Sequence, residues 1–216
     1  MYNFSTKQYS EIISEIRERI ISAEILSNEK KNIVFIESTS LQIRKILELI
    51  AYLSVLVNNE KLNHKSKNEW HPEKIINTLS EKTTIFYPLP SHIFFEDHEK
   101  NQPTLIPFGY NSALSQEEFI QAYKQCGSIL HAQHPLKDKI NIEKYVTEHV
   151  TLLNKLKNLL TSHTIGIRHD ANKYTFLYVT IDFTNTENTK QSIIREFKAH
   201  IYNENELKKI FNMEYN

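Results

Sequence analysis

The spacing of apolar residues changes near Ser162 from a helical period to a period of two. Before this point apolar side chains recur every three or four residues, and after it they alternate in the short segments 164–168, 174–183 and 192–201. An amphipathic helix buries one stripe and a strand buries one face, so the change predicts helices first and strands afterwards. We therefore expect an α+β protein with a small antiparallel sheet towards its C-terminal end.

The part of the chain before Ser162 contains several segments with helical spacing, namely 5–28, 33–57, 72–82, 115–134 and 142–160. Ser5 with Gln8, and Ser115 with Glu118, match the capping-box pattern that begins helices. The second of these segments is the most apolar, which predicts that it lies at the centre of a bundle of about five helices.

The expected organisation has two regions, a helical bundle over 1–161 and, over 162–216, the sheet with a short terminal helix (204–211) packed on the bundle. Within the first region, residues 83–115 contain four of the six prolines and six aromatic residues. Proline ends helices, so we predict a long loop that its aromatic side chains anchor. A loop of this length is rare unless it is functional, disordered or contains short strands.

The composition excludes several classes of function. Lys and Arg number 26 and Asp and Glu number 26, which excludes a broadly basic nucleic-acid coat and an acidic tail but not a local patch. One cysteine, Cys126, excludes a disulfide framework and a multi-cysteine zinc site, and three glycines leave no phosphate-binding loop of the usual kinds. No apolar run is long enough for a signal peptide or a membrane span, so we expect a cytoplasmic protein without cofactor, metal or membrane partner.

Three charged residues, Glu37, Arg44 and Glu48, lie within an arc of roughly 40° on the otherwise apolar helix 33–57. We expect Arg44 to pair with Glu48 at i+4, and with Glu37 from the other side, because an unpaired buried charge is costly. Two interpretations are open at this point. The stripe is either the solvent-facing side of the helix or the lining of a polar cavity.

A second unusual segment runs from Lys124 to His134 and contains Gly127 and His131. Lys124 and His131 are seven residues apart on one helical face, and His134 follows one turn later. Glycine inside a helix costs about 1 kcal/mol relative to alanine, so Gly127 indicates that another helix crosses closely there. The histidines either stabilise the helix C-terminus, act as acid–base or substrate-binding groups, or bind a metal together with a carboxylate from elsewhere.

A helix with Glu37, Arg44 and Glu48, followed by a helix that ends in Ile-Leu-His131, resembles the core of HEPN domains, which are helical modules of bacterial conflict systems. The resemblance covers roughly residues 5–160, and it implies a metal-independent ribonuclease in which an arginine precedes the catalytic histidine by a few residues. Here Lys124 stands in place of that arginine, a departure that leaves catalysis open.

Another segment, Arg195 to His200, has the spacing of the same motif. We predict a strand there, and residues five apart in a strand point to opposite faces of the sheet. The two side chains could not act on one substrate, so we treat this match as coincidental.

The leading hypothesis is a HEPN-like module that binds or cleaves RNA or a nucleotide in a defence or toxin–antitoxin setting. In an active version His131 would move a proton from the ribose 2′-hydroxyl, and a cation would neutralise the phosphate charge. The candidate catalytic residues are Arg44, Glu48, Lys124 and His131, and the candidate substrate-binding residues are Glu37 and His134.

The alternative is a non-enzymatic interaction or regulatory subunit that binds a protein partner through the C-terminal sheet and the aromatic loop. The zero net charge and the aromatic residues on both faces of strand 174–183 favour it. Homodimerisation through the bundle is compatible with both hypotheses.

Two further features of the sequence bear on its chemistry. Trp70 and His71, with Lys65 and Lys67, form a small basic and aromatic segment that either contacts RNA or is a solvated loop. Cys126 faces away from His131 at i+5, which predicts a buried structural thiol rather than a nucleophile.

Overall fold

The computed structural model describes residues 5–29, 31–97, 102–132, 134, 136, 140–169, 173–184, 191–200, 205 and 207–209. Its helices are α1 (Thr6–Asn28), α2 (Ile33–Val57), the 3₁₀-helix η1 (Asn59–Lys61), α3 (His64–Lys67), α4 (Pro72–Ser80), α5 (Gln116–Ile129) and α6 (Ile142–Leu160). Its strands are β1 (Leu89–Asp97), β2 (Gln102–Pro107), β3 (Ser162–Arg168), β4 (Lys173–Ile181) and β5 (Ser192–His200). The protein is therefore of the predicted α+β class.

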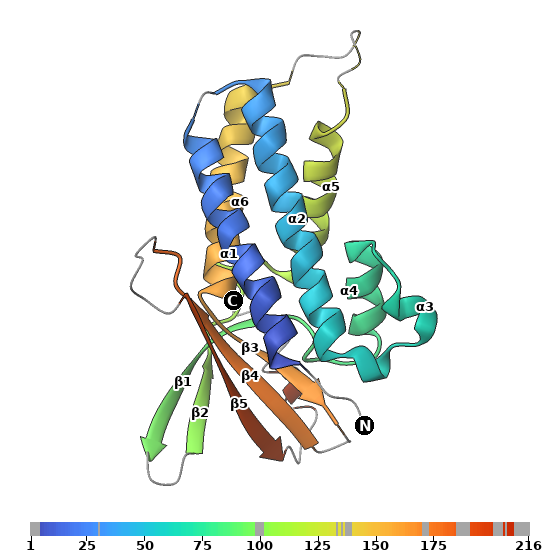
Figure 1. Ribbon diagram of the computed structural model, residues 1–216, viewed down its shortest axis with the longest axis vertical. Helices are drawn as coiled ribbons and strands as arrows, with labels where there is room; N and C mark the ends of the chain where they lie inside the picture. Colours follow the sequence, from blue (N-terminus) through green and yellow to red (C-terminus); the bar gives the residue numbers. More distant parts are fainter. Residues whose placement is uncertain are drawn as a thin grey trace.

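The long helices α1, α2, α5 and α6 lie side by side, and the sheet covers one end of this bundle (Figure 1). The strands pair antiparallel in the order β2-β1-β3-β4-β5. The short helices α3 and α4 lie beside the sheet-proximal end of α2 (Figure 1). Because α2 and α5 run in opposite directions, residues late in α5 lie beside residues early in α2.

The helix starts and the three C-terminal strands agree closely with the sequence-based prediction. The Ser5 hydroxyl accepts from the Gln8 N–H, and Ser115 and Glu118 form the complete capping box that begins α5. The strand β5 is present, so the reason for rejecting the Arg195 to His200 match stands. The predicted terminal helix (204–211) falls largely outside the described residues. The part of it that the structure describes, Asn205 and residues 207–209, is helical.

The prediction of one long loop over 83–115 is wrong, because this segment contains the hairpin of β1 and β2. Two of its prolines, Pro103 and Pro107, lie in β2, which is an edge strand of the sheet. An edge strand pairs on one side only and can contain residues without an N–H donor. The sheet is therefore assembled from both predicted regions of the chain, with Leu89 of β1 paired to Thr164 of β3.

Helix α2 forms the centre of the hydrophobic core, as predicted. Ile43, Ile46, Leu47 and Ile50 are fully buried. Each such side chain contributes roughly 1.5–3 kcal/mol through removal of apolar surface from water. Because these buried side chains hold α2 in one orientation, they also determine where the polar residues of α2 lie.

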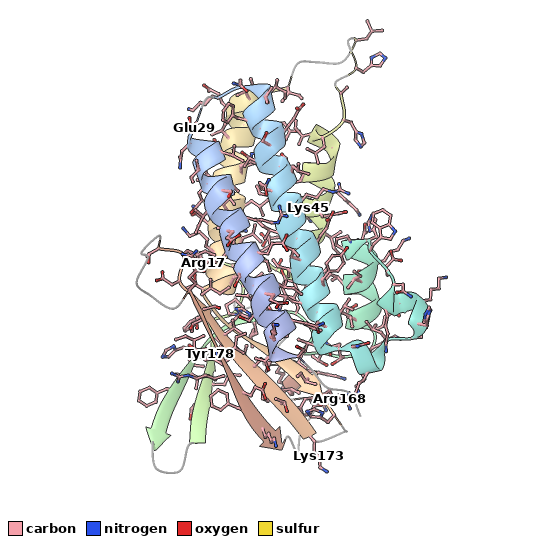
Figure 2. The ribbon with its side chains drawn as sticks, viewed as in Figure 1. Arg17, Glu29, Lys45, Arg168, Lys173 and Tyr178 are labelled. Carbon is pink, nitrogen blue, oxygen red and sulfur yellow. The ribbon has the colours of Figure 1, made fainter. Side chains whose placement is uncertain are left out.

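Polar contacts join the bundle to the sheet. Arg17 of α1 is buried, and its Nε and Nη2 donate to the backbone oxygens of Asp182 (2.6 Å) and Thr184 (2.8 Å), just after β4; Figure 2 shows this side chain on the sheet-facing side of α1. The Tyr9 hydroxyl lies 3.3 Å from Nε2 of His163 in β3, whose Nδ1 lies 3.0 Å from the Leu160 oxygen. Burial lowers the pKa of His163 to about 4, so its imidazole is neutral near pH 7.

No helix in the described part of the chain has both the length and the apolar character needed to cross a membrane.

Candidate functional site

The charged stripe of α2 is partly covered by α5. Nε of Arg44 lies 3.5 Å from Oε1 of Glu48, and Nζ of Lys45 lies 2.7 Å from Oε2 of the same carboxylate. The side chains of Arg44 and Glu48 are 26% and 13% exposed, whereas that of Lys45 is 47% exposed and points outward from the middle of α2 (Figure 2). The stripe is thus neither a fully solvated face nor the lining of an enclosed cavity. The expected i, i+4 pair of Arg44 and Glu48 is present.

Tyr123 of α5 is the residue that meets Arg44. Nη2 of Arg44 donates to the Tyr123 hydroxyl at 2.6 Å, and the guanidinium carbon lies 4.1 Å from the centre of the tyrosine ring. The same hydroxyl donates to Oε1 of Glu48 at 3.4 Å. Burial is the main cause of the raised pKa of Tyr123, so the phenol keeps its proton near pH 7.

Gly127 provides the space that this arrangement needs. A methyl group added at Gly127 would overlap Nη1 of Arg44. The predicted close approach of another helix is therefore confirmed: α2 crosses α5 here, and an arginine side chain fills the gap.

Aromatic rings extend the contact from Tyr123 to the surface. The centre of the His71 ring lies 5.4 Å from that of Tyr123, and the centre of the Trp70 ring lies 5.8 Å from that of His71, both in edge-to-face geometry. Trp70 is 65% exposed. We call the set Arg44, Tyr123, His71 and Trp70 the aromatic–cation column.

The turn before α4 holds the outer end of the aromatic–cation column in place. Oε1 of Glu69 accepts from the backbone N–H groups of Trp70 (3.1 Å) and His71 (3.0 Å). The hydrogen bond from the His71 N–H is the main cause of the lowered pKa of Glu69. The Nδ1 atom of His71 is buried and has no hydrogen-bond partner among the residues that the structure describes.

The cations around the column are matched by carboxylates. Lys124 pairs with Glu73 of α4 at 2.8 Å, and Lys74 lies 3.8 Å from Glu69. Lys124 is therefore on the same side of α5 as the column, but it contacts α4 rather than Arg44. The four cations and three carboxylates named around the column leave it close to neutral.

The other candidate residues lie elsewhere. Helix α5 ends at Ile129, and His131 and His134 beyond it are exposed, with Nδ1 of His134 accepting from the Leu136 N–H at 3.2 Å. Glu37 is half-buried two turns before Arg44 and forms no ion pair within the described residues. Among those same residues, no hydrogen bond or ion pair joins His131 or His134 to Arg44, Glu48 or Lys124. The structure thus brings Arg44 and Glu48 together at Tyr123, pairs Lys124 with α4, and leaves both histidines apart from them.

Two features of the site bear on its chemistry. Cys126 is buried, and burial raises its pKa to about 12, which confirms a structural thiol. The described part of the chain contains no group of three or more His, Cys, Asp or Glu side chains placed to hold a metal ion.

The sequence alone does not mark Tyr123 as part of the candidate site. It occupies an apolar position of α5, and its partners Arg44 and Glu48 are distant in the sequence. The sequence shows Trp70 and His71 as aromatic residues beside lysines, but their link to Arg44 exists only in three dimensions.

Comparison of the chain with protein-family models, with curated proteins and with solved structures finds no match.

Proposed function

We propose that the aromatic–cation column binds a nucleotide unit, free or within single-stranded RNA, by stacking of a base on Trp70. The observation that carries this proposal is the 65% exposure of the only tryptophan, whose ring is supported edge-on by His71 and, behind it, by Tyr123. A stacking contact between a base and an aromatic side chain contributes about 1–3 kcal/mol. Because neighbouring rings already hold the Trp70 side chain, it loses little conformational entropy when a base stacks on it.

Arg44 would supply the polar part of recognition. Its Nε and Nη2 are engaged by Glu48 and Tyr123, and among the described residues Nη1 has no hydrogen-bond partner. A guanidinium held by two partners is preorganised to donate to a phosphate or ribose oxygen. Because the surrounding charges nearly cancel, binding should depend on stacking more than on phosphate contacts and should have a shallow salt dependence.

The fluorescence of Trp70 tests the proposal directly, because it is the only tryptophan in the chain. Oligoadenylate RNA and AMP should both quench it if the site recognises one nucleotide unit, whereas RNA alone should quench it if several nucleotides are needed. Absence of quenching by both ligands would contradict the proposal.

A matched pair of variants measures the contribution of the ring. Trp70→Ala should weaken binding of labelled RNA, followed by anisotropy, by roughly 5- to 100-fold, which corresponds to the loss of one stacking contact. Phe108→Ala is the control, because Phe108 is 57% exposed after the β1–β2 hairpin and outside the aromatic–cation column. It should leave the affinity unchanged.

A protein-interaction role is the second candidate, and one observation favours it. The hairpin region exposes Phe94 (54%), Ile106 (45%) and Phe108 (57%). Exposed apolar clusters are common at protein–protein interfaces. If a partner or a second copy covers this face, Phe94→Ala and Phe108→Ala should weaken that association in light scattering, and Trp70→Ala should not.

A further inference from the structure

A pocket of about 250 Å³ lies between α5 and α6, and its floor is formed in part by α2. A cavity needs about 10–15 Å³ of such space to hold one water molecule, so this pocket has room for a small organic molecule. The residues around its floor are Ser40, Leu114, Ala122, Cys126 and His149, and all of them are buried.

Ser40 and His149 form a hydrogen-bonded pair at this floor. The Ser40 hydroxyl oxygen lies 2.8 Å from Nε2 of His149, and the two residues are 0% and 4% exposed. If Nε2 carried the proton, the Ser40 hydroxyl proton would have no acceptor among the described residues, at the cost of an unsatisfied buried donor. The favoured arrangement has Ser40 donating to Nε2, and the imidazole proton is then on Nδ1.

In this tautomer the Nδ1–H of His149 is the donor of the pair that Ser40 does not use. It has no partner among the residues that the structure describes, and it is not one of the buried unsatisfied polar atoms. His149 borders this pocket and, on another side, a void of about 10 Å³. A void of that size holds at most about one water molecule, so only the larger pocket has room for a ligand.

The floor carries no charge near pH 7. Burial lowers the pKa of His149 to about 4, and burial raises the pKa of Cys126 to about 12, so the imidazole and the thiol are both neutral. The rim is polar, and its charges are paired. Glu118 pairs with Lys155, and Glu148 pairs with Lys144 at 3.7 Å and accepts from Nε2 of Gln125 at 2.5 Å. Both lysines are therefore engaged by carboxylates, and neither is left to balance the charge of a bound anion.

We propose that this pocket binds a small uncharged ring compound whose carbonyl or ring nitrogen accepts a hydrogen bond from Nδ1–H of His149. The apolar walls formed by Leu114, Ala122 and Leu152 would cover the ring, and the Tyr145 side chain would border it. The proposal does not depend on the nucleotide-binding surface, because the pocket residues of α5 lie on the opposite side of that helix from Tyr123 and Gly127.

The experiment uses benzamide and benzoate, which have nearly the same shape and differ in charge, in an NMR titration of the full chain. Benzamide should bind with a Kd of about 1 mM, a value typical of so small a ligand. Benzoate should bind at least about tenfold more weakly, because its charge would lose water over an uncharged floor and find both rim lysines already paired. Equal binding of the two, or no binding of benzamide, would overturn the proposal.

Variants on the exposed side of α6 locate the site. Thr151→Phe places a ring over the pocket mouth and should abolish benzamide binding, whereas Val150→Phe on the same helix, away from the pocket, should not. His149→Phe keeps a ring but removes the donor, and the Ser40 hydroxyl can then turn to a helix carbonyl. This variant should weaken benzamide binding by roughly tenfold, as expected for one lost hydrogen bond to a buried donor.

Trp70→Ala separates this site from the nucleotide surface. It should leave benzamide binding unchanged even where it removes RNA binding. If Trp70→Ala abolished benzamide binding, or if Thr151→Phe left it intact, the ring compound would be bound elsewhere and the proposal would be wrong.

Discussion

The two sides of α5 differ in how they hold polar groups. The side that faces α2 and α4 is packed against them, and its polar groups are paired around the buried Tyr123, so that a ligand there would meet the exposed ring of Trp70. The side that faces α6 is concave, and its floor has the neutral pair of Ser40 and His149. An open surface competes with water for each contact and gains mainly from stacking, whereas a concave one removes its ligand from water. One helix thus contributes to two surfaces, and binding at each should respond differently to pH, substitution and salt.

Acidification should affect the covered side most. The pKa values of His149 and His163 are about 4, against about 6.5 in the unfolded chain, so between these values the unfolded state binds more protons. Their contribution to stability is complete above pH 6.5 and is lost as the pH falls towards 4. We expect a loss of about 3 kcal/mol for each histidine by pH 4, measured by urea unfolding across this range.

The matched variants for this prediction are His149→Phe and His131→Ala. Removing His149 should flatten the dependence of the unfolding free energy on pH, because the shifted group is gone. Removing the exposed His131 should leave the slope as it is. A His149→Phe protein with the wild-type slope would show that His149 is not held neutral in the folded state.

Arg44→Ala should have the next largest effect. It leaves Tyr123 without its cation, leaves the 13% exposed Glu48 with Lys45 alone, and opens space beside Gly127. We expect a loss of roughly 1–2 kcal/mol in unfolding free energy and a clear loss of RNA affinity. Lys124→Ala breaks an exposed pair with Glu73 and should cost less than about 0.5 kcal/mol. If Arg44→Ala and Lys124→Ala lowered the unfolding free energy equally, Arg44 would be no more firmly held by its partners than the solvent-exposed Lys124.

Gly127→Ala should separate stability from binding. The added methyl group displaces the end of the Arg44 side chain, which is flexible, while alanine favours the helix by about 1 kcal/mol over glycine. We therefore expect a melting temperature close to that of the wild type, together with RNA affinity lowered several-fold. A variant that binds RNA as the wild type does would show that the position of the guanidinium is not used in binding.

Local signals explain which parts of the fold the sequence predicts well. The starts of α1 and α5 follow from caps within a few residues, and the bounds of α2 and α6 follow from sustained apolar spacing. The β1–β2 hairpin was missed because Pro103 and Pro107 argue against strands unless the edge position of β2 is known. Edge position is a property of the assembled sheet and cannot be obtained from one segment.

The candidate site was predicted only in part for a similar reason. The pair of Arg44 and Glu48 follows from i, i+4 spacing on one helix. Tyr123 and His149 each occupy an apolar position of a helix, so periodicity counts them as core residues. Their polar atoms find partners 79 and 109 residues away. Only the packing of the helices shows that a core position also carries a hydroxyl or imidazole with a polar partner on another helix.

His131→Ala is the substitution with the smallest expected effect, and it tests the ribonuclease hypothesis. His131 is exposed beyond the end of α5, so we expect the unfolding free energy to stay within about 0.5 kcal/mol and RNA affinity to be unchanged. If the wild-type protein cleaves RNA with His131 as its acid or base, the variant should bind as before and lose cleavage. Cleavage that persists in His131→Ala would exclude this role, and a loss of binding would place His131 in contact with the RNA that the aromatic–cation column holds.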